Sequence, residues 1–243
     1  MNAVITAGAR VDAEFAKRIG TSVKALARIG DRSMLGAVID AARAAGAGRI
    51  AVVGGDEVRA ACAGTVDAIV QESESGAVNL QRALGAWGGD GALLYLTSDM
   101  PFVNAPALQK FIDAVPPESL AIPVTDCATF EQRFPGAPPF GTAIAGERIV
   151  NGGAFWIPAG AAKRVESLAM RFFNARKSIP RMAMLLGPAL CIRFAMRRVS
   201  IDALEREARR KLGIPALAIR GAPPELAYDV DTLDEYRYAA ERA

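Results

Sequence analysis

The chain has 243 residues, 51% of them hydrophobic, which is enough to bury a substantial core, and we expect a single domain over residues 1–243. Its 29 basic and 26 acidic residues leave a formal net charge of only +3, a balance that argues against nucleic acid or an anionic membrane as the main partner. The chain contains no histidine, which excludes a Ser-His-Asp triad, a histidine-ligated zinc centre and an imidazole base.

Short apolar runs alternate with helical patterns through the first half of the chain. Such alternation is typical of βαβ units around a mostly parallel sheet. The apolar runs predict strands at residues 3–6, 49–53, 68–70 and 92–96. The helical patterns predict helices at residues 34–45 and 77–86. We therefore expect an α/β fold in which helices flank a mostly parallel sheet.

The second half of the chain departs from this regular alternation. A helix at residues 108–115 and a strand at 119–124 come first. Residues 125–139 are rich in Pro, Gly and polar residues, which favours a loop over the site. Two strand-like pieces, 141–145 and 148–157, are broken by glycines, and their closeness predicts a short antiparallel piece. The remaining expected elements are a helical, basic subregion at residues 161–211, a strand at 217–219 and a helix at 233–242.

The cysteines and the N-terminus indicate the compartment. Cys62, Cys127 and Cys191 are widely spaced, which favours neither a disulfide framework nor a zinc site and fits a reducing environment. The first residues have the pattern of a strand rather than of a signal peptide. No apolar segment reaches the roughly 20 residues that a membrane span needs. We expect a cytoplasmic protein.

Small residues follow the first predicted strand, in Ala7-Gly8-Ala9-Arg10. Such residues let backbone N–H groups approach a phosphate closely, although a simple tight turn has the same composition. The loop matches neither GxGxxG nor the P-loop pattern GxxxxGK[ST]. Lys24 lies between this loop and an apolar segment, where its ammonium could reach phosphate oxygens. An ordinary solvated lysine is the plainer explanation of Lys24 taken alone.

Two further segments of the sequence carry carboxylates that could bind a metal ion. Asp99 ends the strongest predicted strand, and ligands in open parallel sheets bind beyond the carboxyl ends of strands. Carboxylate oxygens at such a place suit Mg²⁺. Asp229 and Asp231 alternate along an extended segment just before the last predicted helix. Taken singly, helix N-capping is the plainer explanation of these residues.

The order of these pieces resembles the MobA-like NTP transferases. Members of that family run from a small-residue loop, through K-x-L-x-x-(I/L)-G-x-x-(M/P)-L, to a D-x-P strand end and a final D-(I/V)-D-T-x-(E/D)-(E/D). The corresponding segments here are Ala7-Gly8-Ala9-Arg10, residues 24–35, Asp99-Met100-Pro101 and residues 229–235. Residues 75–80 also look like the family's nucleoside-binding segment, and Asn151-Gly152-Gly153 resembles its acceptor-side glycine turn.

The resemblance implies a fold like that of the nucleotide-diphospho-sugar transferases and a nucleotidyltransferase that uses Mg²⁺, an NTP and a small phosphorylated acceptor. The implied metal ligands are Asp99, Asp231 and, as support, Asp229. The implied catalytic residues are Lys24, Arg10 and Asp99. The implied nucleotide-binding residues are Ala7, Gly8, Ala9, Arg10, Lys24, Gly54, Asn79 and Ser98. The implied acceptor-side residues are Asn151, Gly152, Gly153, Arg176 and Lys177.

One departure from the family pattern affects the phosphate-binding loop. The family loop usually has a second glycine and a GxR(M) continuation, whereas this chain has Ala9 and then a longer loop at residues 11–18. Both Arg10 and Arg18 therefore stay candidates for contact with the phosphates.

Nucleotidyl transfer depends on charge neutralisation and alignment, so the lack of histidine is compatible with it. The base stays open, and so does the acceptor: molybdopterin, a sugar phosphate, phospholactate and a lipid-precursor phosphate all fit. Three other functions compete. A GT-A glycosyltransferase usually shows D-x-D at the strand end, where this chain has Asp99-Met100-Pro101. An NAD-dependent Rossmann enzyme needs GxGxxG after the first strand, which this chain lacks. A non-catalytic nucleotide-binding protein is the third.

The helical subregion 161–211 is the candidate for a lid or for a homodimer contact. Its apolar residues, including Phe172 and Phe173, favour packing on the sheet or on a second subunit. Contact of Arg176 and Lys177 with the acceptor phosphate is the alternative.

Overall fold

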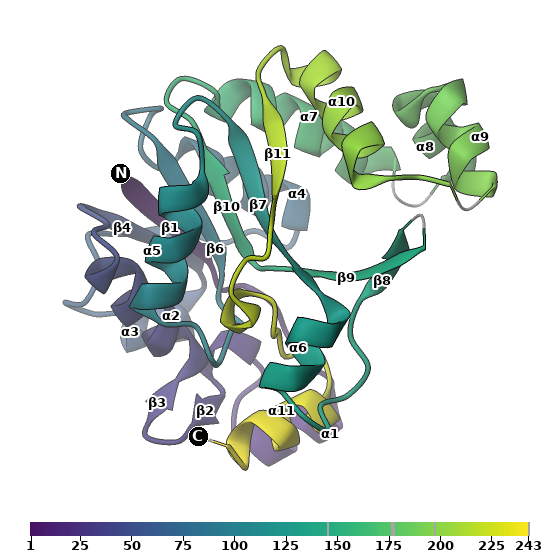
Figure 1. Ribbon diagram of the computed structural model, residues 1–243. Coiled ribbons are helices and arrows are strands. Elements are labelled where there is room, and N and C mark those ends of the chain that lie inside the picture. The colour runs from purple at the N-terminus through teal and green to yellow at the C-terminus, as the bar shows by residue number, and fades with distance from the viewer. Residues whose placement is uncertain (145, 176–177, 197, 243) are drawn as a thin grey trace.

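The computed structural model describes residues 1–144, 146–175, 178–196 and 198–242, and it has the expected α/β architecture. One mixed sheet crosses the molecule, with helices on both faces (Figure 1). Its strands lie in the order β5 (Ala68–Gln71), β4 (Ile50–Gly54), β1 (Asn2–Thr6), β6 (Leu93–Thr97), β10 (Ala154–Ile157), β7 (Leu120–Asp126), β9 (Glu147–Asn151) and β8 (Thr142–Ile144). A further strand, β11 (Ala216–Arg220), pairs with β7.

The first half of the chain forms the parallel part of the sheet. β1 is parallel to β4 on one side and to β6 on the other, so that Thr6 lies level with Val53 and Thr97. β5 extends this block beyond β4, also in parallel. All four strands therefore end at the same edge, which is the edge where such sheets bind ligands.

The antiparallel part is larger than the sequence predicts. β8 and β9 pair as expected, and residues 148–157, which the sequence pattern breaks at Asn151-Gly152-Gly153, form parts of two strands, β9 and β10. β10 leaves the hairpin and runs antiparallel between β6 and β7. The break falls at Gly152 and Gly153, whose N–H groups donate to Pro123 and Leu226 carbonyls at 2.9 and 2.8 Å. These bonds redirect the chain from the hairpin into the centre of the sheet.

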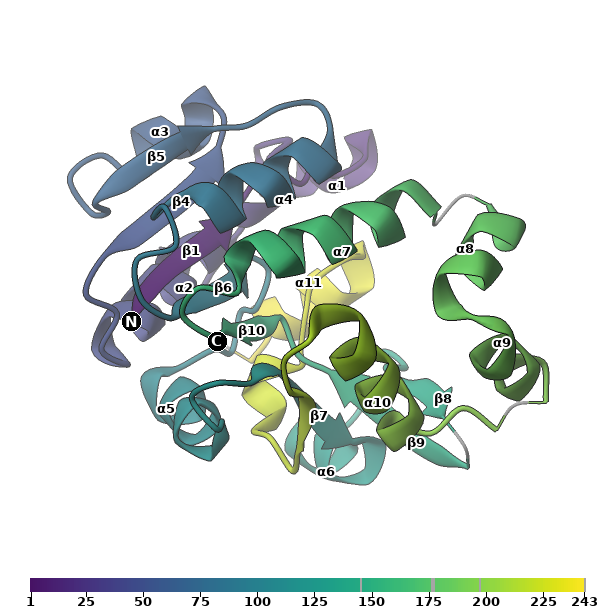
Figure 2. The same ribbon diagram turned by 90° about the horizontal axis from the view of Figure 1, so that it is seen from above.

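Two pairs of helices cover the faces of the parallel block. On one face, α2 (Met34–Ala44) and α5 (Ala105–Ala114) bury Val38, Leu108 and Phe111 against the sheet. On the other face, α4 (Gly76–Gly85) and α7 (Ala162–Ala175) lie side by side (Figure 2). Burial of these apolar faces supplies most of the driving force for folding.

A third apolar cluster surrounds Tyr228, which is fully buried. It is closed by three helices, α1 (Ala13–Ile19), α6 (Cys127–Arg133) and α11 (Leu233–Ala240). The expectation of loops at residues 11–18 and 125–139 was wrong for most of both segments. Asp12 and Asp126 each accept a bond from the N–H three residues later and so start a helix. Pro and Gly residues conceal the second of these helices in the sequence.

The helical subregion begins with α7 and continues with α8 (Ile179–Leu186), α9 (Pro188–Ala195) and α10 (Ile201–Leu212). α10 packs beside β11, whereas α8 and α9 stand away from the sheet in both views (Figures 1 and 2). Among the described residues, no helix has the length and apolar character that crossing a membrane requires. The smaller elements are α3 (Asp56–Ala61), η1 (Lys24–Leu26), β2 (Arg28–Ile29), β3 (Arg32–Ser33) and η2 (Pro224–Leu226).

Gly54, at the end of β4, is expected to tolerate no side chain. A β-carbon there would lie 2.5 Å from a methyl of Val58 on α3. Gly54→Ala should therefore lower the free energy of unfolding by about 1–3 kcal/mol, the usual cost of overpacking. Urea denaturation measures this change. Gly85→Ala is the control: Gly85 has open space around its α-carbon, so the substitution should be neutral or stabilising, and an equal loss in both variants would contradict the packing argument.

Candidate functional site

A polar cavity of about 620 Å³ opens at the carboxyl ends of the parallel strands. Its walls are the loop after β1, residues 72–74 after β5, the first turns of α4 and the end of β6. The lining includes six of the residues singled out from the sequence, namely Gly8, Ala9, Arg10, Asn79, Ser98 and Asp99. The cavity thus joins segments from four separate parts of the chain.

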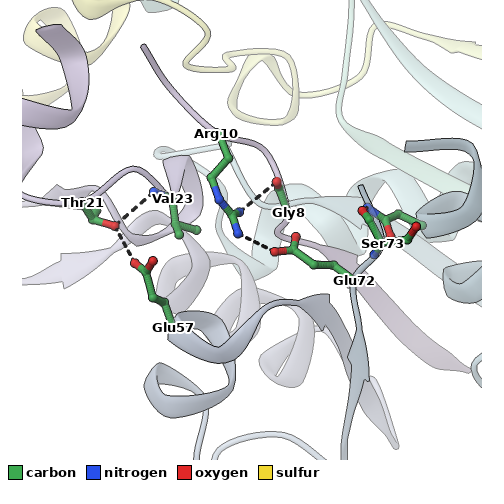
Figure 3. Close-up of polar contacts among 8 residues, drawn as sticks. Gly8, Arg10, Thr21, Val23, Glu57, Glu72 and Ser73 are labelled. Atoms are coloured by element: carbon green, nitrogen blue, oxygen red, sulfur yellow. Dashed lines mark hydrogen bonds and ion pairs between the residues drawn. The ribbon is translucent and has the colours of Figure 1, made fainter. Parts of the chain in front are cut away.

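Arg10 holds the loop after β1 in place. Its guanidinium donates to the Gly8 carbonyl at 2.9 Å and forms an ion pair with Glu72 (Figure 3). A β-carbon at Gly8 would collide with the Glu72 carboxylate, so a larger residue would displace that group. One cation and one anion therefore face each other across this part of the cavity.

The segment that carries Lys24 is tied to the same loop. The Lys24 N–H donates to the Ala9 carbonyl at 3.0 Å. The Thr21 hydroxyl accepts from the Val23 N–H and donates to Glu57 on α3, at 3.0 Å each (Figure 3). These bonds fix the backbone on both sides of Lys24 and turn its side chain inward, where only 8% of it is exposed. Lys24 is therefore not an ordinary solvated lysine.

The Lys24 ammonium joins two carboxylates from distant parts of the chain. Its Nζ lies 2.6 Å from Asp99 Oδ2 and 2.5 Å from Asp231 Oδ1. Burial lowers the pKa of Lys24, but the two adjacent carboxylates raise it by more, so the net pKa lies above the usual value. Lys24 is a fixed cation at neutral pH.

The two acidic segments meet because a backbone bond joins them: the Val230 N–H donates to the Asp99 carbonyl at 3.0 Å. Neither Asp99 nor Asp231 caps a helix. Thr232 caps α11 in a capping box with Glu235, and Asn104 caps α5. The capping explanation therefore fails here, and the carboxylates are left for another task.

The donor set suits a hard divalent cation. Asp99 Oδ1 is buried and, within the described part of the chain, has no hydrogen-bond partner, which is costly for a carboxylate oxygen unless a ligand binds it. The neighbouring Asp229 is largely buried, and burial together with the charges of Asp99 and Asp231 raises its pKa to about 6. No three acidic, Cys or His side chains of the described residues converge as a ready metal cluster. Mg²⁺ is commonly held by one or two carboxylates together with substrate phosphates, which these residues can provide.

The other predicted residues lie at different depths. Ala7 is buried behind the cavity, with its N–H bonded to the Val53 carbonyl at 2.8 Å, and Gly54 is buried against α3. The Asn79 side chain bonds both backbone groups of Ser73, at 2.6 and 2.8 Å, and so fixes that part of the wall.

The predicted acceptor-side residues of the described chain do not line the polar cavity itself. Asn151 and Gly152 line a separate, apolar cavity, and Gly153 packs against Thr97 and Met100. Arg176 and Lys177 lie outside the described residues.

Several lining residues were missed from the sequence. Glu72 follows β5 at the same edge as Asp99, so the strand-end argument applied to Asp99 could have found it. Three further lining residues are polar positions within apolar strands, namely Thr6, Tyr95 and Thr97. The side-chain oxygens of Thr6 and Tyr95 lie 3.0 Å apart. These polar residues alternate with apolar residues along their strands, and that alternation could have indicated that they share one face of the sheet.

Comparison with known proteins agrees with this geometry. The model of the MobA-like NTP transferase domain family matches residues 3–211. Bifunctional protein GlmU from Acidovorax ebreus is 32% identical over 136 residues, which cover 51% of this chain and 27% of GlmU. The match thus spans about a quarter of the length of that relative.

Solved structures share the fold over the whole chain. A hypothetical transferase from Thermus thermophilus superposes with a TM-score of 0.82 at 26% identity, covering 97% of this chain and 100% of its own. Rv0371c from Mycobacterium tuberculosis, in complex with manganese, superposes with a TM-score of 0.55 at 19% identity, covering 100% of this chain and 98% of its own.

Proposed function

Because the chain belongs to the MobA-like NTP transferase family and is thus a nucleotidyltransferase, we propose that it transfers an NMP from an NTP to a small phosphorylated acceptor, with Mg²⁺ as cofactor and release of pyrophosphate. The observation that carries this proposal is the contact of one ammonium, on Lys24, with the carboxylates of Asp99 and Asp231 beside the Gly8 loop. This group of charges is net negative, so it can serve a polyanionic substrate through a bound divalent cation, which the carboxylates would hold.

Asp99 and Asp231 are the residues that would hold the metal, with Asp229 as their neighbour. The fit rests on Asp99 Oδ1, for which the described residues supply no hydrogen-bond partner, and on the oxygen-only donor set. A bound Mg²⁺ supplies positive charge that neutralises phosphate oxygens and orients them.

In the reaction, an oxygen of the acceptor phosphate attacks the α-phosphorus of the NTP. The bond from the α-phosphorus to the α–β bridging oxygen breaks, and pyrophosphate leaves with the bonding electrons. Two anions must approach, so the chain's task is to neutralise and align them. Lys24 contributes a fixed positive charge, and the backbone N–H groups of the Gly8 loop can contact phosphate oxygens. An ionised phosphate oxygen needs no general base, which is consistent with a chain that has no histidine.

The test is pyrophosphate release from each of ATP, GTP, CTP and UTP, mixed with candidate phosphorylated acceptors and either Mg²⁺ or Mn²⁺. We expect release that needs all three components. A thermal-shift series with the same NTPs checks binding separately, because a ligand raises the melting temperature as its concentration exceeds Kd. If no NTP binds with either metal, the proposal is wrong.

Glu72→Gln is expected to tighten NTP binding about three- to tenfold. The substitution removes a negative charge from the cavity and releases Arg10 from its ion pair, so that both changes favour a triphosphate. Isothermal titration with the preferred NTP measures the effect. Glu225→Gln is the matched control, because Glu225 also pairs with an arginine, Arg133, is about as exposed as Glu72 and does not line the cavity. Weaker binding by Glu72→Gln would mean instead that Glu72 is needed to position Arg10.

A further inference from the structure

One face of the sheet carries apolar side chains that no helix fully covers. Leu120 and Ile122 of β7 and Phe155 of β10 are only partly buried. Their neighbours on the opposite face, Ala121 and Ala154, are completely buried. Strands in the middle of a sheet with helices on both sides are normally buried on both faces. The partial exposure therefore marks a place where the fold leaves apolar surface unfilled.

Two adjoining cavities, of about 430 and 330 Å³, lie over this face. Both are lined by Leu120, Ile122 and Phe155. The first is bounded by Leu168 and Phe172 of α7, and the second by Leu204 of α10. We call the two together the apolar trough, defined by these six residues. The carboxylate of Glu205 also lines it, but it accepts the Ala218 N–H at 2.7 Å and is thus satisfied.

The trough begins at the polar cavity and leads away from it. Leu80, Tyr95 and Thr97 line both the polar cavity and the first part of the trough. The far part of the trough includes Asn151 and Gly152. At the junction, Thr97 Oγ1 is buried and has no hydrogen-bond partner among the described residues. The change from polar to apolar lining at Thr97 suits a ligand with a polar group at the end of an apolar chain.

We propose that the acceptor is the phosphate monoester of an apolar-chain alcohol, whose chain lies in the trough and whose phosphate lies near Thr97. This inference rests on the proposed function and names its acceptor class. A polyhydroxylated acceptor such as a sugar phosphate would leave most of its hydroxyls without partners against these walls, which costs binding free energy. An alkyl or prenyl chain has no such groups and gains from removal of its surface from water.

The competing explanation is that the chain's own α8 and α9, rather than a substrate, cover the trough. They expose Met184 and Ile192, which are 83% and 60% accessible and do not line the trough. The trough is continuous with the polar cavity, which favours a substrate in the trough over coverage by α8 and α9. Binding experiments on the full chain distinguish the two.

The test is titration calorimetry of the full chain with n-alkyl phosphates from ethyl to octyl. We expect Kd to fall about two- to fourfold for each added methylene, as burial of a CH₂ group predicts. Leu204→Glu puts a charge into the trough at an exposed helix position and should weaken octyl phosphate binding at least tenfold. Met184→Glu makes the same change outside the trough and should leave binding unchanged. A Kd independent of chain length, or unaffected octyl binding in Leu204→Glu, would overturn the inference.

NTP binding measured on the same samples separates this inference from the proposed function. If an NTP binds and pyrophosphate is released with a sugar phosphate while alkyl phosphates show no dependence on chain length, the proposed function stands and the acceptor class is wrong. If alkyl phosphates bind as expected but no NTP binds, the trough holds a ligand that is not an acceptor, and both proposals fail.

Discussion

Asp99→Asn is expected to slow nucleotidyl transfer by about 100- to 1000-fold, the usual cost of removing one well-placed charged group from such a site. The substitution keeps the shape of the side chain but removes the negative charge that faces Lys24 and replaces one carboxylate oxygen by an amide NH2 group, which cannot bind a cation. Pyrophosphate release under saturating NTP measures the loss. A rate within tenfold of the unchanged protein would remove Asp99 from the site.

The fold of this variant should survive. The bond that joins the two acidic segments uses the backbone carbonyl of Asp99, which the substitution does not alter, and the Lys24–Asp231 contact remains. Asp90→Asn is the matched control: Asp90 lies just before β6, whereas Asp99 lies just after it, and its exposed carboxylate pairs with Arg49. Equal loss of activity in both variants would point to a general disturbance of β6 rather than to the site.

The parallel part of the fold could be predicted from the sequence because its strands are continuous apolar runs with turn residues between them. The antiparallel part could not. Whether residues 148–157 pair with their own neighbour or enter the sheet beside β6 depends on bonds to Pro123 and Leu226, which the local sequence does not contain. α1 and α6 were missed although Asp12 and Asp126 were available as cap signals. Residues 11–18 were compared with the loop of the family pattern, and the Pro and Gly residues within 125–139 favoured a loop there.

For the site, the sequence supplied residue types and order but not contacts. Taken singly, helix capping accounted for Asp99 and Asp231 equally well, and only the use of Asn104 and Thr232 as caps removes that explanation. The place of Glu72 after β5 indicated the edge of the sheet at which it lies, but its pairing with Arg10, 62 positions away in the chain, could not be predicted. The apolar trough was also invisible: Leu120 and Phe155 have the composition of core residues, and only their partial exposure distinguishes them.

Lys24→Met is expected to slow transfer by about 100- to 1000-fold and to destabilise the protein as well. Without the ammonium, Asp99 keeps a carboxylate that is only 16% exposed and has no cation beside it. Loss of one partner from a fully buried pair costs roughly 3–5 kcal/mol. We expect about 2 kcal/mol here, because Asp231 is 67% exposed and water can solvate it. Chemical denaturation measures the stability, and pyrophosphate release the rate.

The same variant tests whether the carboxylates are a cation site. In the unchanged protein the ammonium contacts the oxygens that a divalent ion would use, so its removal should increase the rise in melting temperature that Mn²⁺ produces. Lys24→Arg keeps the charge and should recover most of the stability, yet its planar guanidinium cannot reproduce a compact ammonium between two carboxylates, so the transfer rate should stay low. Equal Mn²⁺ responses in Lys24→Met and the unchanged protein would mean that the metal binds elsewhere. Because stability and the Mn²⁺ response are both measured without substrate, a larger Mn²⁺ response in Lys24→Met would identify the carboxylates as metal ligands even if the acceptor were still unknown.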